Sequence, residues 1–167
     1  MFKKIIMRKA QLKDFKKVYG IILECTAWLR AKNINQWYPA YPKNLFEKDI
    51  KDGKVYYFIS ENKLIGTVTL STKKPFYYPK NVWKSSSKIW YLTKLAVPRK
   101  LKNKEIGKRL LMQIEKKAKA LKIKRLRLDI IKSNKRLRKY YNDKGFKNFR
   151  YVTIKETPSL LMEKEIK

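Results

Sequence analysis

The segment from residue 89 to residue 131 constrains the fold more than any other part of this sequence. It begins with the run IWYLTKLAV at 89–97. This run is too apolar for the solvent-exposed edge of a sheet, so it predicts a central strand. From Lys104 to Lys122, apolar residues recur at helical spacing and basic residues cover most of the other face. The following IKRLRLDII alternates as a strand. Strand, helix and strand in succession predict a right-handed parallel crossover.

The flanking sequence predicts antiparallel strands and further helices around this crossover. It contains no internal repeat and no domain boundary, so we expect one domain over residues 1–167. The remaining elements expected, in chain order, are a strand at 4–9, a helix at about 12–32, a short helix that Asn44 caps, a hairpin of strands at 55–60 and 63–71, a helix at about 134–144, and strands at about 146–154 and 159–166.

The residue composition excludes several classes of protein. The chain has no His and one Cys, so it cannot form a zinc site from ordinary His and Cys ligands, nor a Ser-His or Cys-His nucleophile pair. Cys25 continues the helical apolar series of Val18, Ile22 and Leu29, which predicts a core position for it. No apolar run approaches the roughly 20 residues that span a bilayer, and the N-terminus does not resemble a secretory signal, so we expect a cytoplasmic protein. From the lack of His and Cys ligands we also expect no bound metal.

The charge of the chain is strongly positive. The sequence has 44 Lys and Arg residues against 13 Asp and Glu residues, a formal net charge of +31, which favours contact with polyanions. The basic residues are spread evenly from Lys3 to Lys167, and no zinc-ligand spacing or RNA-recognition signature accompanies them. The charge alone therefore identifies no partner.

Two segments have residues suited to a functional site. The loop from Pro98 to Gly107 joins the central strand to a helix N-terminus, where free N–H groups, lysines and a glycine suit a phosphate. An ordinary basic helix start explains the same residues equally well. In the later helix, Asn134, Leu137 and Tyr141 lie on one face. Because Leu137 is apolar, we expect this face to point into the protein. Tyr141 is either a site residue or a core tyrosine.

The sequence resembles the GCN5-related N-acetyltransferases, the GNAT family. The resemblance is carried by YLTKLAVPRKLKNKEIGKRLL, KAKALKIKRLRLDI and SNKRLRKYYNDKGF, which follow one another as in the acetyl-CoA-binding half of that family. Upstream, INQWYPAYP and LIGTVTL resemble the N-terminal part of one bacterial branch. The resemblance covers nearly the whole chain. It implies an α+β fold with a mixed, mostly antiparallel sheet, in which a central parallel strand pair splays apart between flanking helices.

The resemblance also implies an acetyl-CoA site. In the family, pantetheine lies between the splayed strands, here 92–97 and 125–131. The diphosphate lies on a loop whose three marked positions correspond to Lys102, Glu105 and Gly107, and only Gly107 matches the pattern. A Glu in place of Gly adds negative charge and disfavours a positive φ, so we expect it to weaken CoA binding and the nearby lysines to offset the loss. The implied cofactor-binding residues are Leu95, Ala96, Val97, Lys102, Asn103, Lys104, Glu105, Ile106, Gly107, Lys108, Asn134 and Tyr141.

The activity implied is that of an acyl-CoA-dependent N-acyltransferase, which transfers an acetyl group to a primary amine by direct attack in a ternary complex. Backbone N–H groups near Ala96 and Val97 match the family's oxyanion position, and Tyr141 matches its general acid. The sequence assigns no general base. The candidates are water molecules or the carboxylates of Glu24, Glu47, Asp49 and Asp129.

The acceptor, a small amine or a peptide, is not identified by the sequence. The candidate substrate-binding residues are the aromatic side chains Trp28, Trp37 and Tyr38, and a homodimer is among the partners considered. Two alternatives stay open. Glu105 suggests a catalytically weak CoA-binding regulator, and the net charge suggests an RNA- or ribosome-associated protein built on the same fold.

Overall fold

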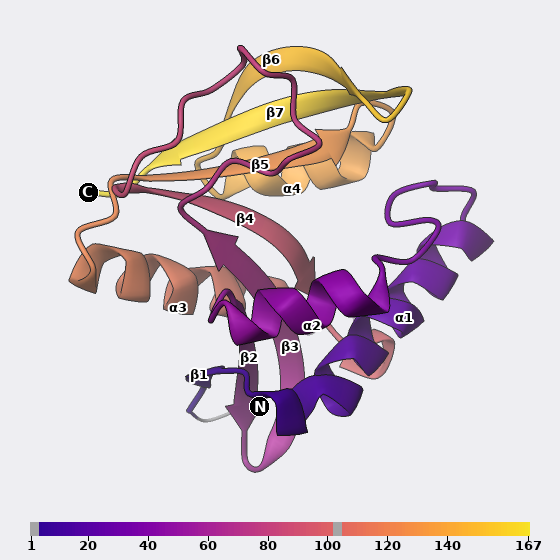
Figure 1. The fold of residues 1–167 in the computed structure, drawn as a ribbon, viewed down its shortest axis with the longest axis vertical. Helices are drawn as coiled ribbons and strands as arrows, with labels where there is room; N and C mark the ends of the chain where they lie inside the picture. Colours follow the sequence, from indigo (N-terminus) through magenta and orange to yellow (C-terminus); the bar gives the residue numbers. More distant parts are fainter. Residues whose placement is uncertain (1–3, 102–104) are drawn as a thin grey trace. The chain divides into compact units, whose positions relative to one another are not determined.

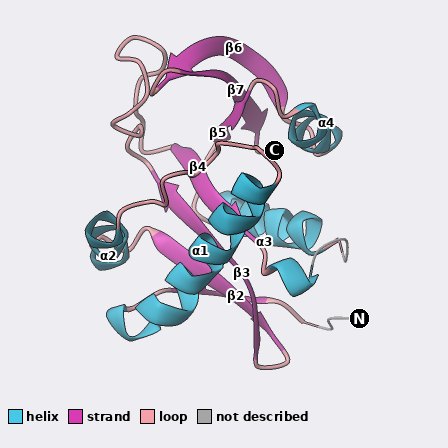
Figure 2. Cartoon of the chain, turned by 90° about the vertical axis from the view of Figure 1, so that its right-hand side faces the viewer, coloured by secondary structure: helices cyan, strands magenta, loops and turns pink. Residues whose placement is uncertain are grey.

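The computed structural model describes residues 4–101 and 105–167, which form two compact units. The first unit combines the chain up to Leu70 with Lys94–Ile114, and the second combines Ser71–Thr93 with Glu115–Lys167. The strand order is β1-β2-β3-β4-β5-β7-β6, and β4 (Ile89–Ala96) contributes residues to both units. Figure 1 labels the elements, and Figure 2 colours them by type. The expectation of a single domain stays a prediction.

The first unit contains three antiparallel strands. β1 (Ile6–Lys9) pairs with β2 (Val55–Ser60), which pairs with β3 (Lys63–Ser71). The turn between β2 and β3 has positive φ at both of its residues, 49° at Glu61 and 61° at Asn62. This pair of positive φ angles is what a type I′ turn requires, and its twist matches that of the strands it joins. The predicted hairpin is therefore confirmed.

Two helices of the first unit enclose its core. A 3-10 turn, η1 (Leu12–Asp14), leads into α1 (Phe15–Ala31), and the backbone N–H of Gln11 donates to the Asp14 carboxylate at 2.9 Å. The inner face of α1 buries Val18 and Ile22 against Phe46 of α2 (Lys43–Lys51). The core residues of this unit are Ala10, Val18, Ile21, Ile22, Cys25, Phe46, Ile50, Val55, Tyr57 and Ala96.

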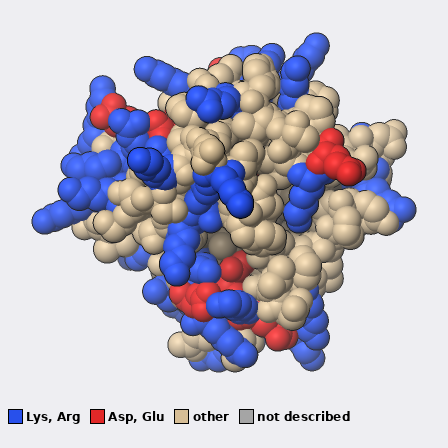
Figure 3. Space-filling view, turned by 45° about the horizontal axis from the view of Figure 1, so that its top comes forward, with Lys and Arg blue, Asp and Glu red and all other residues tan. Residues whose placement is uncertain are grey.

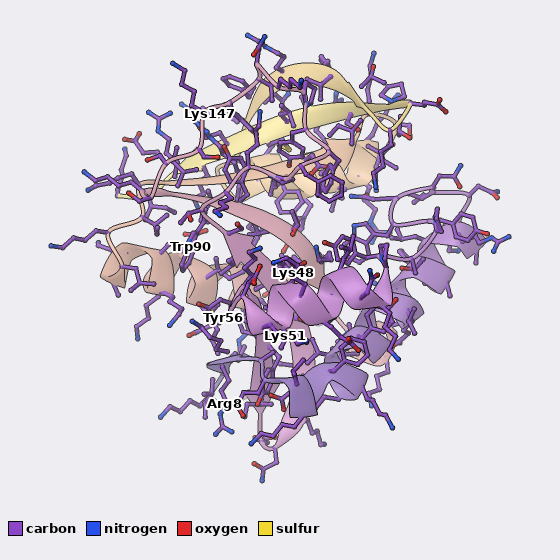
Figure 4. The ribbon with its side chains drawn as sticks, viewed as in Figure 1. Arg8, Lys48, Lys51, Tyr56, Trp90 and Lys147 are labelled. Carbon is purple, nitrogen blue, oxygen red and sulfur yellow. The ribbon has the colours of Figure 1, made fainter. Side chains whose placement is uncertain are left out.

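The start of α2 differs from the expectation. Pro42 is the N-cap, so Asn44 lies inside the helix and does not cap it. Proline suits this position because the helix does not need its missing N–H there. At the other end, Lys48 pairs with Asp52 at 2.9 Å, and the labelled lysines of α2 can be followed in Figure 4. The helix stops before Gly53, whose φ of 68° is typical of the residue that follows a helix C-terminus.

A close approach brings α3 (Ile106–Ala120) against β3. A Cβ atom added at Gly66 of β3 would lie 2.3 Å from Cδ1 of Leu110 and 3.0 Å from the carbonyl oxygen of Ala96. Only a residue without a side chain leaves room for Leu110 at this point. Gly66 therefore fixes how closely the first turns of α3 pack on the strands of the first unit.

The second unit contains the parallel strand pair. β4 pairs with β5 (Arg125–Ile131) from Ile89 opposite Arg125 to Tyr91 opposite Arg127, and both strands run on past this short paired stretch. β5 then pairs antiparallel with β7 (Thr157–Glu165), and β7 with β6 (Lys147–Ile154). α4 (Lys135–Asp143) lies beside these strands (Figure 1). The expected mixed sheet with one central parallel pair is confirmed.

A long loop at residues 72–88 covers one face of the strands of the second unit. Its Tyr78 and Trp83 pack with Tyr91 of β4 and Leu161 of β7. The guanidinium of Arg127 lies 4.6 Å from the Trp83 ring, and its Nε donates to Glu163 at 2.6 Å. The first contact ties the loop to β5, and the second ties β5 to β7.

The basic residues do not gather in one patch on the face drawn in Figure 3. Lys and Arg are spread across that face, with small groups of Asp and Glu between them. Within residues 4–101 and 105–167, no helix has the length and apolar composition needed to cross a membrane. The same residues contain no group of three or more His, Cys, Asp or Glu side chains placed to hold a metal ion.

Candidate functional site

The segment that follows β4 leads to the N-terminus of a helix, α3 (Ile106–Ala120). After η2 (Arg99–Leu101), the predicted site residues Lys102, Asn103 and Lys104 lie outside the described residues. The carbonyl oxygen of Glu105 accepts the N–H of Arg109 at 3.2 Å. The N–H groups of Ile106, Gly107 and Lys108 precede that bond. Such groups, together with the helix dipole, form a binding site for an anion.

Glu105 has the left-handed backbone conformation, with φ of 52°. We expected a Glu at this position to disfavour a positive φ, and the loop adopts one nevertheless. A non-glycine residue pays a steric penalty there, which the surrounding structure must offset. The loop therefore has, at the second position of the family's pattern, a backbone conformation that glycine usually supplies.

The Glu105 side chain points away from the interior. It is 76% exposed, and its carboxylate lies 4.0 Å from the Nζ of Lys108. Water and this lysine both screen its charge. The expected repulsion of an anion by Glu105 is thus smaller than its position in the sequence implies.

The same segment is tied to α1 by Arg99. The backbone N–H of Arg99 donates to the Glu24 carboxylate at 2.7 Å, and its guanidinium lies 3.7 Å from the centroid of the Trp28 ring. A guanidinium over an indole face is a favourable cation–π arrangement. Trp28 thus supports the start of the loop, and its predicted role in substrate binding stays a prediction.

The end of β4 is held by the core of the first unit. Ala96 is buried within that core, and the carbonyl of Val97 accepts the Cys25 thiol at 3.4 Å, while Leu95 is half-buried. Burial raises the pKa of the Cys25 thiol to about 11. Cys25 therefore stays protonated near neutral pH and has the structural role expected of it.

Tyr141 lies on the inner face of α4 in the second unit. It is 7% exposed, and its ring packs against Tyr140 and Phe146, with ring centroids 5.2 and 5.3 Å away. Burial, with smaller contributions from Tyr140 and Asp129, raises the pKa of the Tyr141 phenol well above its ordinary value of 10.0. The hydroxyl is therefore a hydrogen-bond donor across the physiological range.

Asn134 begins α4. Its Oδ1 accepts the backbone N–H of Leu137 at 3.0 Å, which makes it the N-cap of the helix. The capping bond occupies the side-chain oxygen, so a contact with a cofactor would use the Nδ2 group. That contact stays a prediction.

Trp37 and Tyr38, the other candidate substrate-binding residues, lie between α1 and α2. Trp37 packs against the core of the first unit and has φ of 67°. Tyr38 is exposed beneath the guanidinium of Arg30, 4.2 Å from its ring. Tyr38 also lines a shallow apolar groove of about 520 Å³ with Leu23 and Ala27 of α1.

Two of the candidate bases accept hydrogen bonds from the protein. Glu24 accepts the Arg99 N–H, and Asp129 accepts the hydroxyl of the buried Tyr78 at 2.6 Å. These bonds favour structural roles for both residues. A third candidate, Asp49, lies 3.6 Å from the Nζ of Lys94.

Lys94 is a residue that the sequence reasoning missed. It is nearly buried near the end of β4 and lies over the ring of Tyr41. A lysine inside an otherwise apolar strand was the signal that could have identified it, because such a strand rarely buries a cation without a partner.

Comparisons with known proteins place these features in a family context. The profile of the acetyltransferase (GNAT) family matches residues 22–146. The chain is 26% identical over 166 residues to the uncharacterized N-acetyltransferase YesJ of Bacillus subtilis (strain 168), covering 94% of this chain and 88% of YesJ.

Solved structures share the fold. A GNAT-family acetyltransferase from Listeria monocytogenes 4b F2365 has a TM-score of 0.82 at 23% identity, over 96% of this chain and 94% of its own. The PaiA N-acetyltransferase of Thermoplasma acidophilum, solved in complex with coenzyme A, has a TM-score of 0.70 at 23% identity, over 98% of this chain and 99% of its own.

Proposed function

The chain belongs to the acetyltransferase (GNAT) family, and from that membership we propose that it transfers an acetyl group from acetyl-CoA to a primary amine. Enzymes of this family use an acyl-CoA donor. In the proposed reaction the amine nitrogen bonds to the thioester carbon and the C–S bond breaks. The amine loses one proton to solvent or a base, and the departing thiolate gains one. Both substrates are bound together, so no acyl-enzyme forms.

The observation that carries the proposal is the start of α3. The N–H groups of its first turn, at Ile106, Gly107 and Lys108, follow a left-handed residue, Glu105. This arrangement fits a diphosphate, because successive backbone donors and the positive end of the helix dipole face the same anion. Lys108 adds positive charge beside them. These residues would hold the diphosphate of acetyl-CoA.

The end of β4 would hold the reacting carbonyl. As the carbonyl carbon becomes tetrahedral its oxygen gains negative charge, and backbone N–H groups near Ala96 and Val97 would donate to it. Donors that are already fixed in place cost no reorganisation during the reaction. The burial of Ala96 and the bond from Cys25 to Val97 support such rigidity.

Tyr141 would donate a hydrogen bond to the sulfur as the thioester breaks. A phenol with a raised pKa is a weaker acid than a thiol, so full proton transfer to a finished thiolate is unfavourable. The benefit therefore arises while charge builds on sulfur in the transition state. We assign no general base.

The proposal is tested by ligand binding followed by turnover. Acetyl-CoA should raise the melting temperature over micromolar to millimolar concentrations, because it binds the folded state only. Mass spectrometry should then detect acetyl transfer to a member of a panel of amines, polyamines, amino acids and peptides. If CoA, dephospho-CoA and acetyl-CoA all leave the melting temperature unchanged, the proposal is wrong. Stabilisation without transfer to any acceptor would instead favour a regulatory CoA-binding protein.

A further inference from the structure

A nearly buried cation lies in the strand that leads to the proposed reacting centre. The Lys94 side chain is 9% exposed, and its Nζ lies 3.6 Å from Oδ2 of Asp49. It also lies 3.8 Å from the centroid of the Tyr41 ring. A buried ammonium is stable only when charged or aromatic groups replace its hydration, and here both do. We refer to Lys94, Tyr41 and Asp49 as the Lys94 cluster.

The three members of the cluster come from different elements of the first unit. Tyr41 belongs to the segment between α1 and α2, and its carbonyl accepts the hydroxyl of Tyr19 at 2.7 Å. Asp49 belongs to α2, and burial together with the negative charge of Asp49 raises the pKa of the Tyr41 phenol well above its ordinary value. Tyr41 and Asp49 thus present one aromatic face and one carboxylate to the same lysine.

The backbone at Lys94 is also unusual. Its φ is 53°, in the left-handed region that few non-glycine residues occupy. A strand residue in this conformation interrupts the regular alternation of side chains. Strained backbone of this kind is found preferentially at functional sites. A lysine that served stability alone would require neither the strain nor the loss of hydration, since apolar residues replace buried ion pairs without a general loss of stability.

The cluster lies within reach of the proposed chemistry. Ala96, whose N–H we assign to the reacting carbonyl, is two residues after Lys94. Two residues of chain span at most roughly 7 Å. An acceptor that reacts at this carbonyl would therefore carry its other groups within the range that the Lys94 side chain can reach.

We propose that the Lys94 cluster selects an acceptor that carries a carboxylate beside its amine, that is, an amino acid rather than a simple amine or a polyamine. This inference rests on the proposed function. The acceptor carboxylate binds the Lys94 ammonium in place of the Asp49 oxygen, and the Tyr41 ring packs against the carbon atoms of the acceptor. A polyamine would place a second positive charge against Lys94, which is unfavourable in a poorly hydrated site.

The test compares acceptors that differ only in the carboxylate. Glycine, methionine and phenylalanine are each assayed beside the corresponding amide, with wild type and with Lys94→Gln. We expect wild type to prefer the acids by at least tenfold in kcat/KM. Lys94→Gln should raise KM for the acids by at least tenfold and leave the amides nearly unchanged, whereas Lys94→Arg should restore most of the preference. The matched control is Lys54→Gln, which removes a charge 3.6 Å from the other oxygen of Asp49 and should keep the preference.

A binding measurement separates this inference from the proposed function. Titration calorimetry with CoA-saturated protein compares the products N-acetylglycine and N-acetylglycinamide, and the same pair for phenylalanine, without any turnover. Stronger binding of the carboxylate products supports the inference even if Lys94→Gln does not fold. Equal binding of acid and amide products by wild type would overturn the inference while leaving acetyl transfer intact. Equal losses for acids and amides in a folded Lys94→Gln would also overturn it, since they would make Lys94 purely structural.

Discussion

The backbone N–H of Arg99 donates to the carboxylate of Glu24 across 2.7 Å, so the chain that leaves β4 is tied to α1. We expect Glu24→Ala to weaken CoA binding about three- to tenfold, because one hydrogen bond to a charged acceptor no longer orders the loop. Glu24→Gln keeps an acceptor oxygen and should lose less. Calorimetric Kd values for CoA test this, with Glu47→Ala on α2 as control. Unchanged affinity in Glu24→Ala would show that the loop is ordered by other contacts.

Glu105→Gly should tighten CoA binding. Glycine adopts a φ of 52° without steric cost, and the change also removes a carboxylate near the proposed diphosphate, which together give roughly 1 kcal/mol. Glu105→Gln separates the two causes, because it removes the charge and keeps the strained side chain. Equal gains in both variants would assign the effect to charge, and a gain in Glu105→Gly alone would assign it to the backbone. Weaker binding in both would contradict the proposed register of the loop.

Tyr141→Phe should lower kcat at least tenfold and leave the Kd for CoA and the melting temperature near wild type. The ring and its packing are retained, while the donor to the leaving sulfur is lost. Tyr140→Phe, the adjacent control, should change kcat little. Because burial raises the pKa of the Tyr141 phenol, its ionisation should not lower the activity between pH 7 and about pH 10. Small and equal losses of kcat in the two variants would indicate that Tyr141 is a core tyrosine without a catalytic role.

Asp14 should make the free energy of unfolding depend on acid pH. Burial alone would raise its pKa, but the hydrogen bonds from Lys17 and the Gln11 backbone outweigh burial and lower the pKa below 3.8. A lowered folded-state pKa stabilises the fold above the unfolded value, and this contribution is lost as the pH falls through the folded value. We therefore expect Asp14→Asn to cost roughly 1 to 3 kcal/mol at pH 7 and less below pH 4.

Denaturant unfolding at several pH values tests the role of Asp14. The control is Asp143→Asn, because Asp143 is half-exposed and pairs with Lys139 on the surface. Surface pairs contribute little, so its stability difference should be small at every pH. A difference for Asp14→Asn that stays constant from pH 7 to pH 3 would mean that the carboxylate charge is not the cause.

Local periodicity was sufficient to predict most of the elements. The apolar spacing that includes Val18 and Ile22 predicted α1, and the succession from 89 to 131 predicted the parallel pair of β4 and β5. These patterns depend on side chains that repeat along one element. Such repetition is visible in a sequence because burial of one face requires it.

Backbone conformation was harder to predict than the elements. Glu61, Lys94, Glu105, Lys155 and Glu156 all have positive φ, although Lys and Glu rarely adopt it. A search for glycine or asparagine cannot find such positions. Glu105 is one of these positions: its residue type disfavours the conformation, and the loop adopts it nevertheless.

Contacts between elements were the other feature that the sequence did not reveal. Lys94 and Asp49 are 45 positions apart in the chain, and their pairing depends on how α2 lies against β4. The burial of Tyr78 against Asp129 depends in the same way on the path of the loop at 72–88. A local sequence pattern contains no information on contacts between residues that are far apart in the chain. The candidate bases and the Lys94 cluster could therefore be assessed only from the structure.

The stacking of Arg99 on Trp28 gives this protein a spectroscopic property of its own. Indole emission depends on the charge and polarity next to the ring, and here the guanidinium 3.7 Å away belongs to the segment that leads to the proposed diphosphate loop. An anion that draws Arg99 away from the indole would change the intrinsic fluorescence of Trp28. Occupancy of the loop can therefore be followed in real time without an attached dye, and Trp28→Phe identifies the part of the signal that comes from this residue.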